Sequence, residues 1–370
     1  MIKPADRLSN IKEYYFSRKL KEIAELKESG KDILNLGIGN PDMPPPAESI
    51  KILHDRSSEH NNHGYQSYSG NPDLRKAFVK WYKKHFDVEI DANTETLPLI
   101  GSKEGIMHIS MAFLNPGDGV LIPDPGYPAY KSVADLLNAN VINYDLKAEN
   151  GWFPDLEKIQ KFDLENIKIM WVNYPNMPTG TKASLEQLNA LVEFGIKNNI
   201  LICNDNPYSF ILNNEPISIL NIPKAKSIAL ELNSLSKSHN MAGWRVGVVV
   251  GNQEYIKNIL KVKSNVDSGM YLPLQLAAVE ALNSSDLWYE NLNKEYTERR
   301  QVAADLLNKL DCIFDEKQSG MFLWAKIPEN YEDSYEFSDY LLHKYDFFMT
   351  PGAIFGKNGK KFKSPRSCSI

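Results

Sequence analysis

Short apolar runs that alternate with helical patterns dominate the first two thirds of the chain. Helical patterns at 72–85, 102–114, 127–137 and 184–198 separate several of these runs. Such alternation predicts an α/β domain with a mostly parallel sheet, whose ligand site lies at the carboxyl ends of the strands. The predicted strands lie at 33–36, 96–100, 119–122, 140–144, 167–172, 200–204, 227–230 and 246–250.

The pattern becomes rich in helices after about residue 251. Helical patterns lie at 254–262 and 274–282, and a long charged helix follows at roughly 285–310. A final α+β segment contains an apolar run at 320–325 and a helical pattern at 334–344. A length of 370 residues favours about two domains. We therefore predict a large domain at 45–265 and a smaller domain built from residues 1–44 and 266–370.

Charge and cysteine usage exclude several classes of protein. The formal net charge of −5 argues against a nucleic acid or an anionic membrane as a partner. Cys203, Cys312 and Cys368 lie too far apart for a C-x-x-C pair, which argues against a disulfide framework and a zinc site. The chain begins without a signal-peptide pattern, and no apolar stretch is long enough to span a bilayer. We therefore expect a cytoplasmic protein without a metal.

One lysine has neighbours that suit a phosphorylated aldehyde cofactor. Lys237 lies between Ser236 and Ser238, with Ser234 before it and Arg245 eight residues after it. A buried lysine beside positive charge has a lowered pKa, and its neutral amine can form a Schiff base with an aldehyde. Ser234, Ser236 and Arg245 can hold a phosphate. The segment therefore predicts pyridoxal 5′-phosphate.

Polar residues follow other predicted strands at the same edge. Ser102 opens a helix, whose first N–H groups attract phosphate. Tyr127, in a proline-rich turn, can stack on a heteroaromatic ring. Asp205 can pair with a protonated ring nitrogen, and Tyr208 can reach the ring hydroxyl. Ser102 also has a simpler interpretation as an N-cap, Tyr127 as a packing side chain and Asp205 as a capping residue. The polar loop at 173–180, which follows another predicted strand, is typical of an ordinary turn.

In this order the motifs resemble those of the class I/II, fold-type I, pyridoxal-phosphate-dependent aminotransferases. The resemblance runs from about residue 33 to residue 359 and rests on S-L-S-K-x₇-R, P-D-P-G-Y-P and N-x-P-x-x-P-T-G. It implies the fold-type I architecture, Lys237 as the Schiff-base lysine that shifts the proton, and a homodimer. The other implied residues are Asp205 and Tyr208 at the ring, Tyr127 stacked on it, Ser102, Lys103, Ser234, Ser236 and Arg245 at the phosphate, Tyr65 at the partner subunit's phosphate, and Gly39 at the substrate carboxylate.

Two positions depart from the family pattern. Met177 stands just before Pro-Thr-Gly, where the family has an asparagine that bonds the ring oxygen, and Asn176 lies one residue early. After Gly359 the chain is irregular, and Arg366 is the one candidate for the carboxylate-binding arginine. It is displaced by about two residues and follows Pro365, which disfavours a strand.

The resemblance implies an aminotransferase that moves an amino group between an L-amino acid and a 2-oxo acid. The segments at 101–105, 123–128 and 264–269 are similar to those of the LL-diaminopimelate and aspartate group. A pyridoxal-phosphate-dependent C–S lyase on the same fold would use the same lysine, so it stays open as an alternative. An effector-binding domain and a purely structural α/β protein are two further readings.

Overall fold

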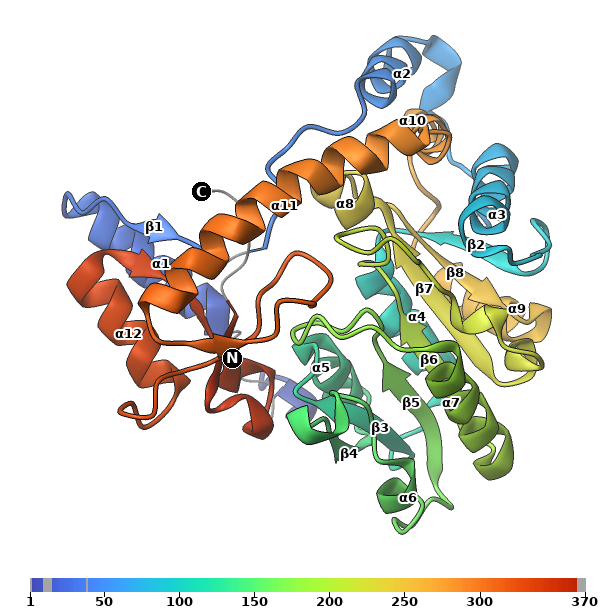
Figure 1. The fold of residues 1–370 in the computed structure, drawn as a ribbon. Helices are drawn as coiled ribbons and strands as arrows, with labels where there is room; N and C mark the ends of the chain where they lie inside the picture. The colour runs from blue at the N-terminus through green and yellow to red at the C-terminus, as the bar shows by residue number, and fades with distance from the viewer. Residues whose placement is uncertain (1, 9–14, 38, 365–370) are drawn as a thin grey trace.

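A seven-stranded sheet forms the centre of the larger body of the molecule (Figure 1). The computed structural model describes residues 2–8, 15–37 and 39–364. The strand order is β2-β8-β7-β6-β5-β3-β4, and only β8 runs antiparallel to its neighbours. The strands are β2 (Thr96–Leu99), β3 (Gly119–Asp124), β4 (Asn140–Asp145), β5 (Ile167–Val172), β6 (Leu201–Asp205), β7 (Ala229–Ser234) and β8 (Gly247–Gly251).

Helices cover both faces of this sheet because its strand residues alternate between two apolar clusters. In β6, Leu201 and Cys203 join one cluster while Ile202 joins the other. The first cluster includes side chains of α4 (Ser102–Phe113), α5 (Pro128–Leu136) and α9 (Gln253–Lys263). The second includes side chains of α3 (Pro72–Phe86), α6 (Leu156–Ile159), α7 (Leu185–Asn198) and α10 (Leu272–Leu282), with α2 (Ala47–Ser57) packed on α10.

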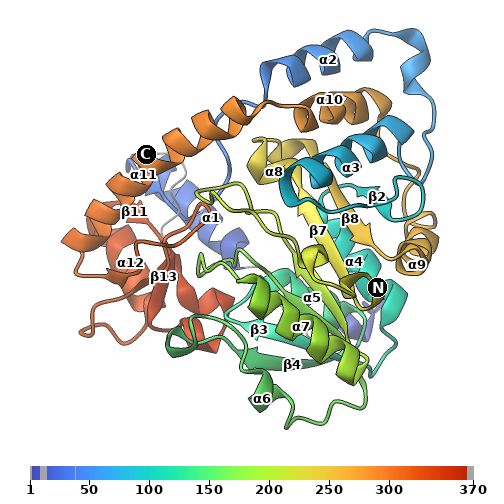
Figure 2. The ribbon, with the colours of Figure 1, turned by 45° about the vertical axis from the view of Figure 1, so that its right-hand side comes forward.

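A smaller body joins the two ends of the chain. Strand β1 (Leu34–Asn35) pairs in parallel with β11 (Phe347–Phe348), and Lys19 forms an ion pair with Asp339 at 2.9 Å. Its other elements are α1 (Tyr15–Glu28), α12 (Ser334–Tyr345), β9 (Ile313–Phe314), β10 (Ala325–Lys326), β12 (Thr350–Pro351) and β13 (Phe362–Ser364). Helix α11 (Asp286–Lys309) runs from one body to the other, as Figure 1 and Figure 2 show.

The α/β class and the mostly parallel sheet are confirmed, and seven of the predicted strands form that sheet. The strand predicted at 33–36 is shorter and belongs to the smaller body. The apolar run at 320–325 forms a regular strand only at its end, where β10 begins at Ala325. Helices α1 and α2 were not predicted. The domain boundaries near residues 45 and 265 stay a prediction.

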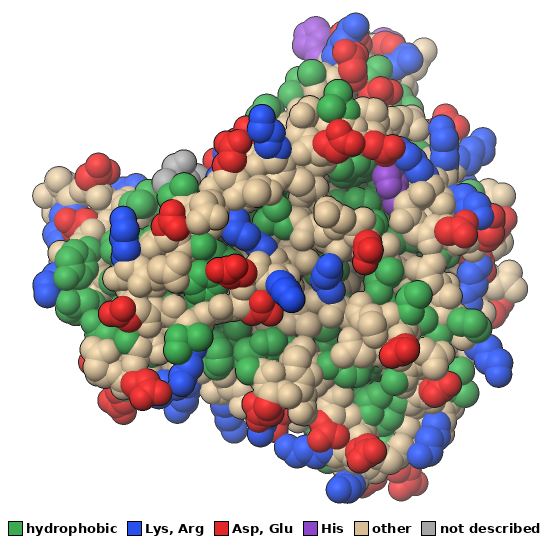
Figure 3. Space-filling view, viewed as in Figure 1, with side chains coloured by type: hydrophobic (Ala, Val, Ile, Leu, Met, Phe, Trp, Pro, Cys, Tyr) green, Lys and Arg blue, Asp and Glu red, His purple; other side chains and the backbone are tan. Residues whose placement is uncertain are grey.

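The visible face in Figure 3 carries Lys, Arg, Asp and Glu side chains intermixed, without a broad region of one sign. Among the described helices, none is both long and apolar enough to cross a bilayer.

Candidate active site

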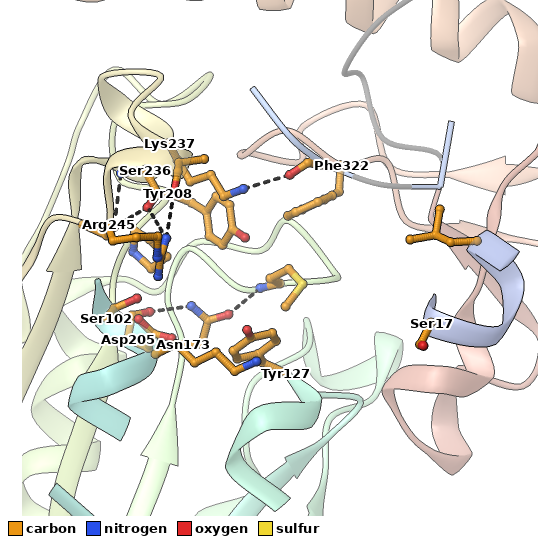
Figure 4. Close-up of a pocket in the computed structure, with 17 residues that line it drawn as sticks. Ser17, Ser102, Tyr127, Asn173, Asp205, Tyr208, Ser236, Lys237, Arg245 and Phe322 are labelled. Carbon is orange, nitrogen blue, oxygen red and sulfur yellow. Dashed lines mark hydrogen bonds between the residues drawn. The ribbon is translucent and has the colours of Figure 1, made fainter. Parts of the chain in front are cut away.

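A cavity of about 520 Å³ lies at the carboxyl ends of the parallel strands and is bordered by the smaller body. Its size suits a small cofactor with a substrate. Ten of the residues predicted from sequence line it (Figure 4). They are Gly39, Ser102, Lys103, Tyr127, Asp205, Tyr208, Ser234, Ser236, Lys237 and Arg245.

Lys237 reaches the cavity from α8 (Leu235–Ser238), a short helix that directly follows β7. Ser234 is the N-cap of this helix, and its hydroxyl accepts a hydrogen bond from the Ser236 amide at 3.1 Å. The Lys237 ammonium donates to the carbonyl oxygen of Gly39 at 2.8 Å. The lysine amine is therefore placed between the large sheet and the N-terminal segment.

Asp205 ends β6 and is buried, with 5% of its surface exposed. Tyr130 donates to its Oδ2 at 3.1 Å, whereas Oδ1 has no hydrogen-bond partner among the described residues. Burial raises the pKa of Asp205 to about 7, and the hydrogen bond from Tyr130 opposes this rise. No helix begins at Asp205, so a capping role does not explain it. A buried carboxylate oxygen is thus left ready for a cationic donor.

Donors converge at the other end of the cavity. Gly101, not Ser102, is the N-cap of α4, so the Ser102 hydroxyl is not used as a cap. The Arg245 guanidinium donates to the Ser236 hydroxyl at 3.4 Å and to the Ala242 carbonyl at 2.8 Å. Gly101 has a φ of +80°, and a Cβ there would overlap the Arg245 guanidinium. This end can bind an anion through hydroxyls, a guanidinium and the start of a helix.

Aromatic rings form the side walls. Tyr127 packs edge-on against Tyr130 at a centroid distance of 5.7 Å, and Tyr130 stacks on Trp171 at 5.1 Å. Tyr208 packs against Phe322 at 5.3 Å. Phe322 was not identified from sequence as a site residue, because its apolar segment looked like a strand. It lies in a loop that enters the cavity from the smaller body.

Asn173 is a second lining residue that the sequence analysis did not single out. It follows β5 at the same sheet edge as Asp205, and that position was the available signal. Its amide donates to the Asp205 carbonyl, and its oxygen accepts from the Met177 amide at 2.6 Å. Met177 lines the cavity beside Tyr208 and Phe322. Asn176 instead accepts from the Thr179 hydroxyl at 2.8 Å and stabilises the turn.

Tyr65 is not among the described residues that line this cavity. Tyr65 is 94% exposed, in a loop whose Gln66 and Ser67 carbonyls lie against Gly269. Other large exposed side chains of this region are Tyr68, Ile100, Val266 and Tyr271. Arg366 lies outside the described residues, so its role stays a prediction.

The cavity fits the cofactor predicted from sequence. The unpartnered Asp205 Oδ1 can accept from a protonated pyridine nitrogen, and Tyr127 offers a ring face. The serines and Arg245 can hold a phosphate, and Lys237 offers a primary amine. These groups supply one partner for each functional part of pyridoxal phosphate.

Comparison with known proteins agrees with this geometry. The family model for aminotransferase class I and II matches residues 31–365. The LL-diaminopimelate aminotransferases of Aquifex aeolicus and Natranaerobius thermophilus are 40% and 42% identical, covering 98% and 97% of this chain and 94% and 93% of theirs. The structure of apo-BacF from Bacillus subtilis is 36% identical with a TM-score of 0.95, covering all of this chain and 94% of its own. The chain therefore belongs to the class I and II aminotransferases, which are pyridoxal-phosphate-dependent enzymes.

Proposed function

We propose that this aminotransferase takes its amino group from LL-diaminopimelate and transfers it to a 2-oxo acid such as 2-oxoglutarate. One observation carries the proposal: two relatives of that name share 40% and 42% of their residues with this chain over nearly its whole length. The similar segments at 101–105 and 264–269 favour the same group, and Ser102 and Lys103 of the first segment line the cavity.

Pyridoxal phosphate, when bound, supplies an aldehyde that takes up amino groups and a ring that accepts electron density from Cα. Lys237 is proposed to hold the cofactor and to move the proton at the reacting carbon. Its position supports this role, because its amine lies at the cavity wall beside Gly39, within reach of a bound cofactor.

Asp205, Tyr208 and Tyr127 are proposed to orient the ring. Once ionised, the Asp205 carboxylate holds a proton on the ring nitrogen, and Tyr130 keeps that carboxylate in place. Tyr208 donates to the ring oxygen, and Tyr127 covers one ring face. The loop contains Met177 where an asparagine is usual, which leaves Tyr208 to supply this bond.

The phosphate is proposed to bind at Ser102, Lys103, Ser234, Ser236 and Arg245. Gly39 is proposed to lie over the substrate carboxylate, and Arg366 stays the candidate cation for that carboxylate. The exposed Tyr65 is proposed to complete this set in a second subunit.

The active form is proposed to be a cytoplasmic homodimer. Tyr65, Val266 and Tyr271 expose large apolar surfaces in adjacent loops, since Gly269 packs on the 66–67 backbone and the His63 and Tyr271 rings lie 5.8 Å apart. A second copy of the chain would cover these side chains.

A donor panel tests the substrate. Purified protein receives pyridoxal phosphate, 2-oxoglutarate and one amino acid at a time, with LL-diaminopimelate, aspartate, methionine or phenylalanine as donor. The proposal expects LL-diaminopimelate to give the highest kcat/KM for glutamate formation. A higher value for any other donor contradicts it. Release of ammonia with pyruvate from a cysteine conjugate, without glutamate, would establish the lyase alternative.

A further inference from the structure

Behind Lys237 lies a buried set of side chains that the proposed mechanism does not use. His239, two residues after the lysine, is fully buried and packs against Trp288 and Tyr289 of α11. Its Nε2 lies 3.1 Å from the Tyr289 hydroxyl, and its Nδ1 lies 2.8 Å from the Ser238 hydroxyl. Trp81 of α3 donates to the same Tyr289 hydroxyl at 2.9 Å. Three helices therefore meet at the segment that carries the lysine.

The Trp81 indole and the Ser234 carbonyl, at the two ends of this set, favour one direction for its hydrogen bonds. The Trp81 indole only donates, so the Tyr289 oxygen accepts from it and its proton is free to go to His239 Nε2. His239 then carries its proton on Nδ1 and donates to Ser238, whose hydroxyl donates to the Ser234 carbonyl at 3.4 Å. The opposite tautomer would turn the Nε2 proton toward the Tyr289 hydroxyl and would break the bond from Ser238 to Ser234.

The ring of His239 stays neutral at ordinary pH, as this series of hydrogen bonds requires. Burial lowers the pKa of His239 to about 3, the nearby His85 adds to this effect, and a hydrogen bond to the Ala281 backbone opposes it. The Trp288 ring stacks on the imidazole at a centroid distance of 6.4 Å, and its indole donates to the Ser238 carbonyl at 3.0 Å. Helix α11 thus holds Ser238 directly at its carbonyl, through Trp288, and indirectly at its hydroxyl, through His239.

Helix α11 also holds the opposite wall of the cavity. Asn293, one turn after Tyr289, donates to the Phe210 carbonyl at 3.0 Å and accepts from the Leu212 amide at 2.6 Å. These bonds fix the segment that follows Tyr208. Two turns further along, Arg300 donates to the Gly320 carbonyl at 2.7 Å in the loop that ends at Phe322. Residues 289, 293 and 300 lie on one face of the helix.

We propose that α11 positions Lys237 against the wall of the cavity that carries Tyr208. On the lysine side, it acts through the hydrogen bonds that run from Trp81 by way of Tyr289 and His239 to Ser238. On the Tyr208 side, it acts through Asn293. Tyr289, His239 and Asn293 are then positioning residues, because none of them lines the cavity. This inference rests on the proposed role of Lys237 as the residue that holds the cofactor. Figure 1 shows α8 beside α11 where that helix leaves the large body.

The test uses variants of the full-length protein, each of which removes one hydrogen bond from the series that links Trp81 to Ser238. Tyr289→Phe removes the hydroxyl, His239→Asn keeps only a donor toward Ser238, and His239→Gln keeps only an acceptor for Tyr289. Tyr144→Phe is the matched control, because it also loses a buried tyrosine hydroxyl bonded at 2.7 Å, here to the Trp171 carbonyl. Readouts are the Kd and capture rate for pyridoxal phosphate, the pH midpoint of the bound cofactor's absorbance, and unfolding by urea.

We expect Tyr289→Phe and both His239 variants to capture the cofactor about ten-fold more slowly and to shift the absorbance midpoint. The double variant Tyr289→Phe/His239→Asn should capture the cofactor no more slowly than either single variant, because both substitutions interrupt the same series of hydrogen bonds. Tyr144→Phe should lose stability without changing cofactor binding. The inference is overturned if Tyr289→Phe and His239→Gln bind the cofactor like Tyr144→Phe. Failure of the wild-type protein to bind pyridoxal phosphate would instead refute the proposed function and this inference together.

Discussion

The Nζ atom of Lys237 lies 2.8 Å from the carbonyl oxygen of Gly39, although 198 residues separate them in the chain. Lys237 belongs to the large sheet body, whereas Gly39 follows the strand that pairs with β11 in the smaller body. A backbone carbonyl of one body thus meets the proposed reactive amine of the other. The site needs both bodies, because Gly39 of the N-terminal segment lines the same cavity as Asp205 of the large sheet.

Gly101 offers a selective test of the phosphate end. Gly101→Ala should weaken pyridoxal phosphate binding by roughly 10- to 100-fold, because its Cβ would displace the Arg245 guanidinium and lose charged hydrogen bonds. Gly117→Ala is the control: its φ is also positive, at +90°, but its Cβ would meet nothing within 4 Å. Both variants should lose about 1 kcal/mol of stability from backbone strain. Equal cofactor affinities in a titration would refute the assigned role of Arg245.

Asp205→Asn should have opposite effects on the cofactor-free and the loaded protein. The raised pKa of about 7 means that the folded protein binds more protons than the unfolded chain between about pH 4 and 7. The stability of the cofactor-free wild type therefore falls as pH rises through that window, by up to roughly 4 kcal/mol. The asparagine variant should lack this fall and be the more stable protein at pH 8.

With cofactor bound, the order should reverse, because asparagine cannot neutralise a protonated ring nitrogen. Transamination should then drop by about 100-fold or more. Urea unfolding of both proteins at pH 5 and pH 8, with and without pyridoxal phosphate, measures these signs. A cofactor-free asparagine variant that is no more stable than wild type at pH 8 would show that Asp205 is not strained by burial.

Tyr65 should act across a subunit interface. Tyr65→Phe should raise the Kd for pyridoxal phosphate by about ten-fold, since it removes one hydroxyl donor to a charged phosphate. Tyr68→Phe, in the same loop and 47% exposed, should leave the Kd unchanged.

Hybrid dimers extend this test. When inactive Lys237→Ala subunits are mixed with Tyr65→Ala subunits, each hybrid contains one site with both residues intact, and should regain about half the wild-type activity. Mixtures that show only the sum of the separate activities, although subunit exchange is proven by mass, would mean that Tyr65 serves its own subunit or none.

His85 should make the fold sensitive to acid. Burial lowers the pKa of His85 to about 4, so the folded protein binds fewer protons than the unfolded chain between pH 6.5 and 4. Stability is lost as pH falls through that window, by roughly 2 kcal/mol after allowance for partial exposure. His85→Phe keeps the ring contacts with Trp81 and Tyr289 and removes the charge. Its free energy of unfolding should exceed that of wild type increasingly below pH 6.5, and parallel pH curves would contradict this.

The sequence predicted those parts of the fold and of the site that depend on hydrophobic periodicity and on the residues at strand ends. Seven strands and most helices of the large body were predicted, because buried parallel strands read as continuous apolar runs. Asp205, Tyr127 and Lys237 were identified because polar residues at the ends of buried strands are costly unless they have a partner or a ligand. Asn173 occupies the same kind of position but was assigned to an ordinary turn.

Long-range contacts could not be predicted in the same way. Nothing local to Phe322 indicates that its loop enters the cavity, since Arg300 holds that loop through backbone carbonyls. The contact of Asp124 with the amides of Lys357 and Asn358, at 3.0 and 2.9 Å, joins the two bodies across more than 230 residues. Helix α1, which brings Ser17 and Leu20 to the cavity, gave no signal that was recognised.

The most direct measurement is glutamate formation from 2-oxoglutarate and LL-diaminopimelate by wild type, Lys237→Ala and the surface control Lys257→Ala, each with excess pyridoxal phosphate. The account predicts turnover by wild type and Lys257→Ala, and a loss of at least about 1,000-fold in Lys237→Ala at unchanged fold. Comparable turnover by Lys237→Ala would contradict the claim that this lysine carries the reaction.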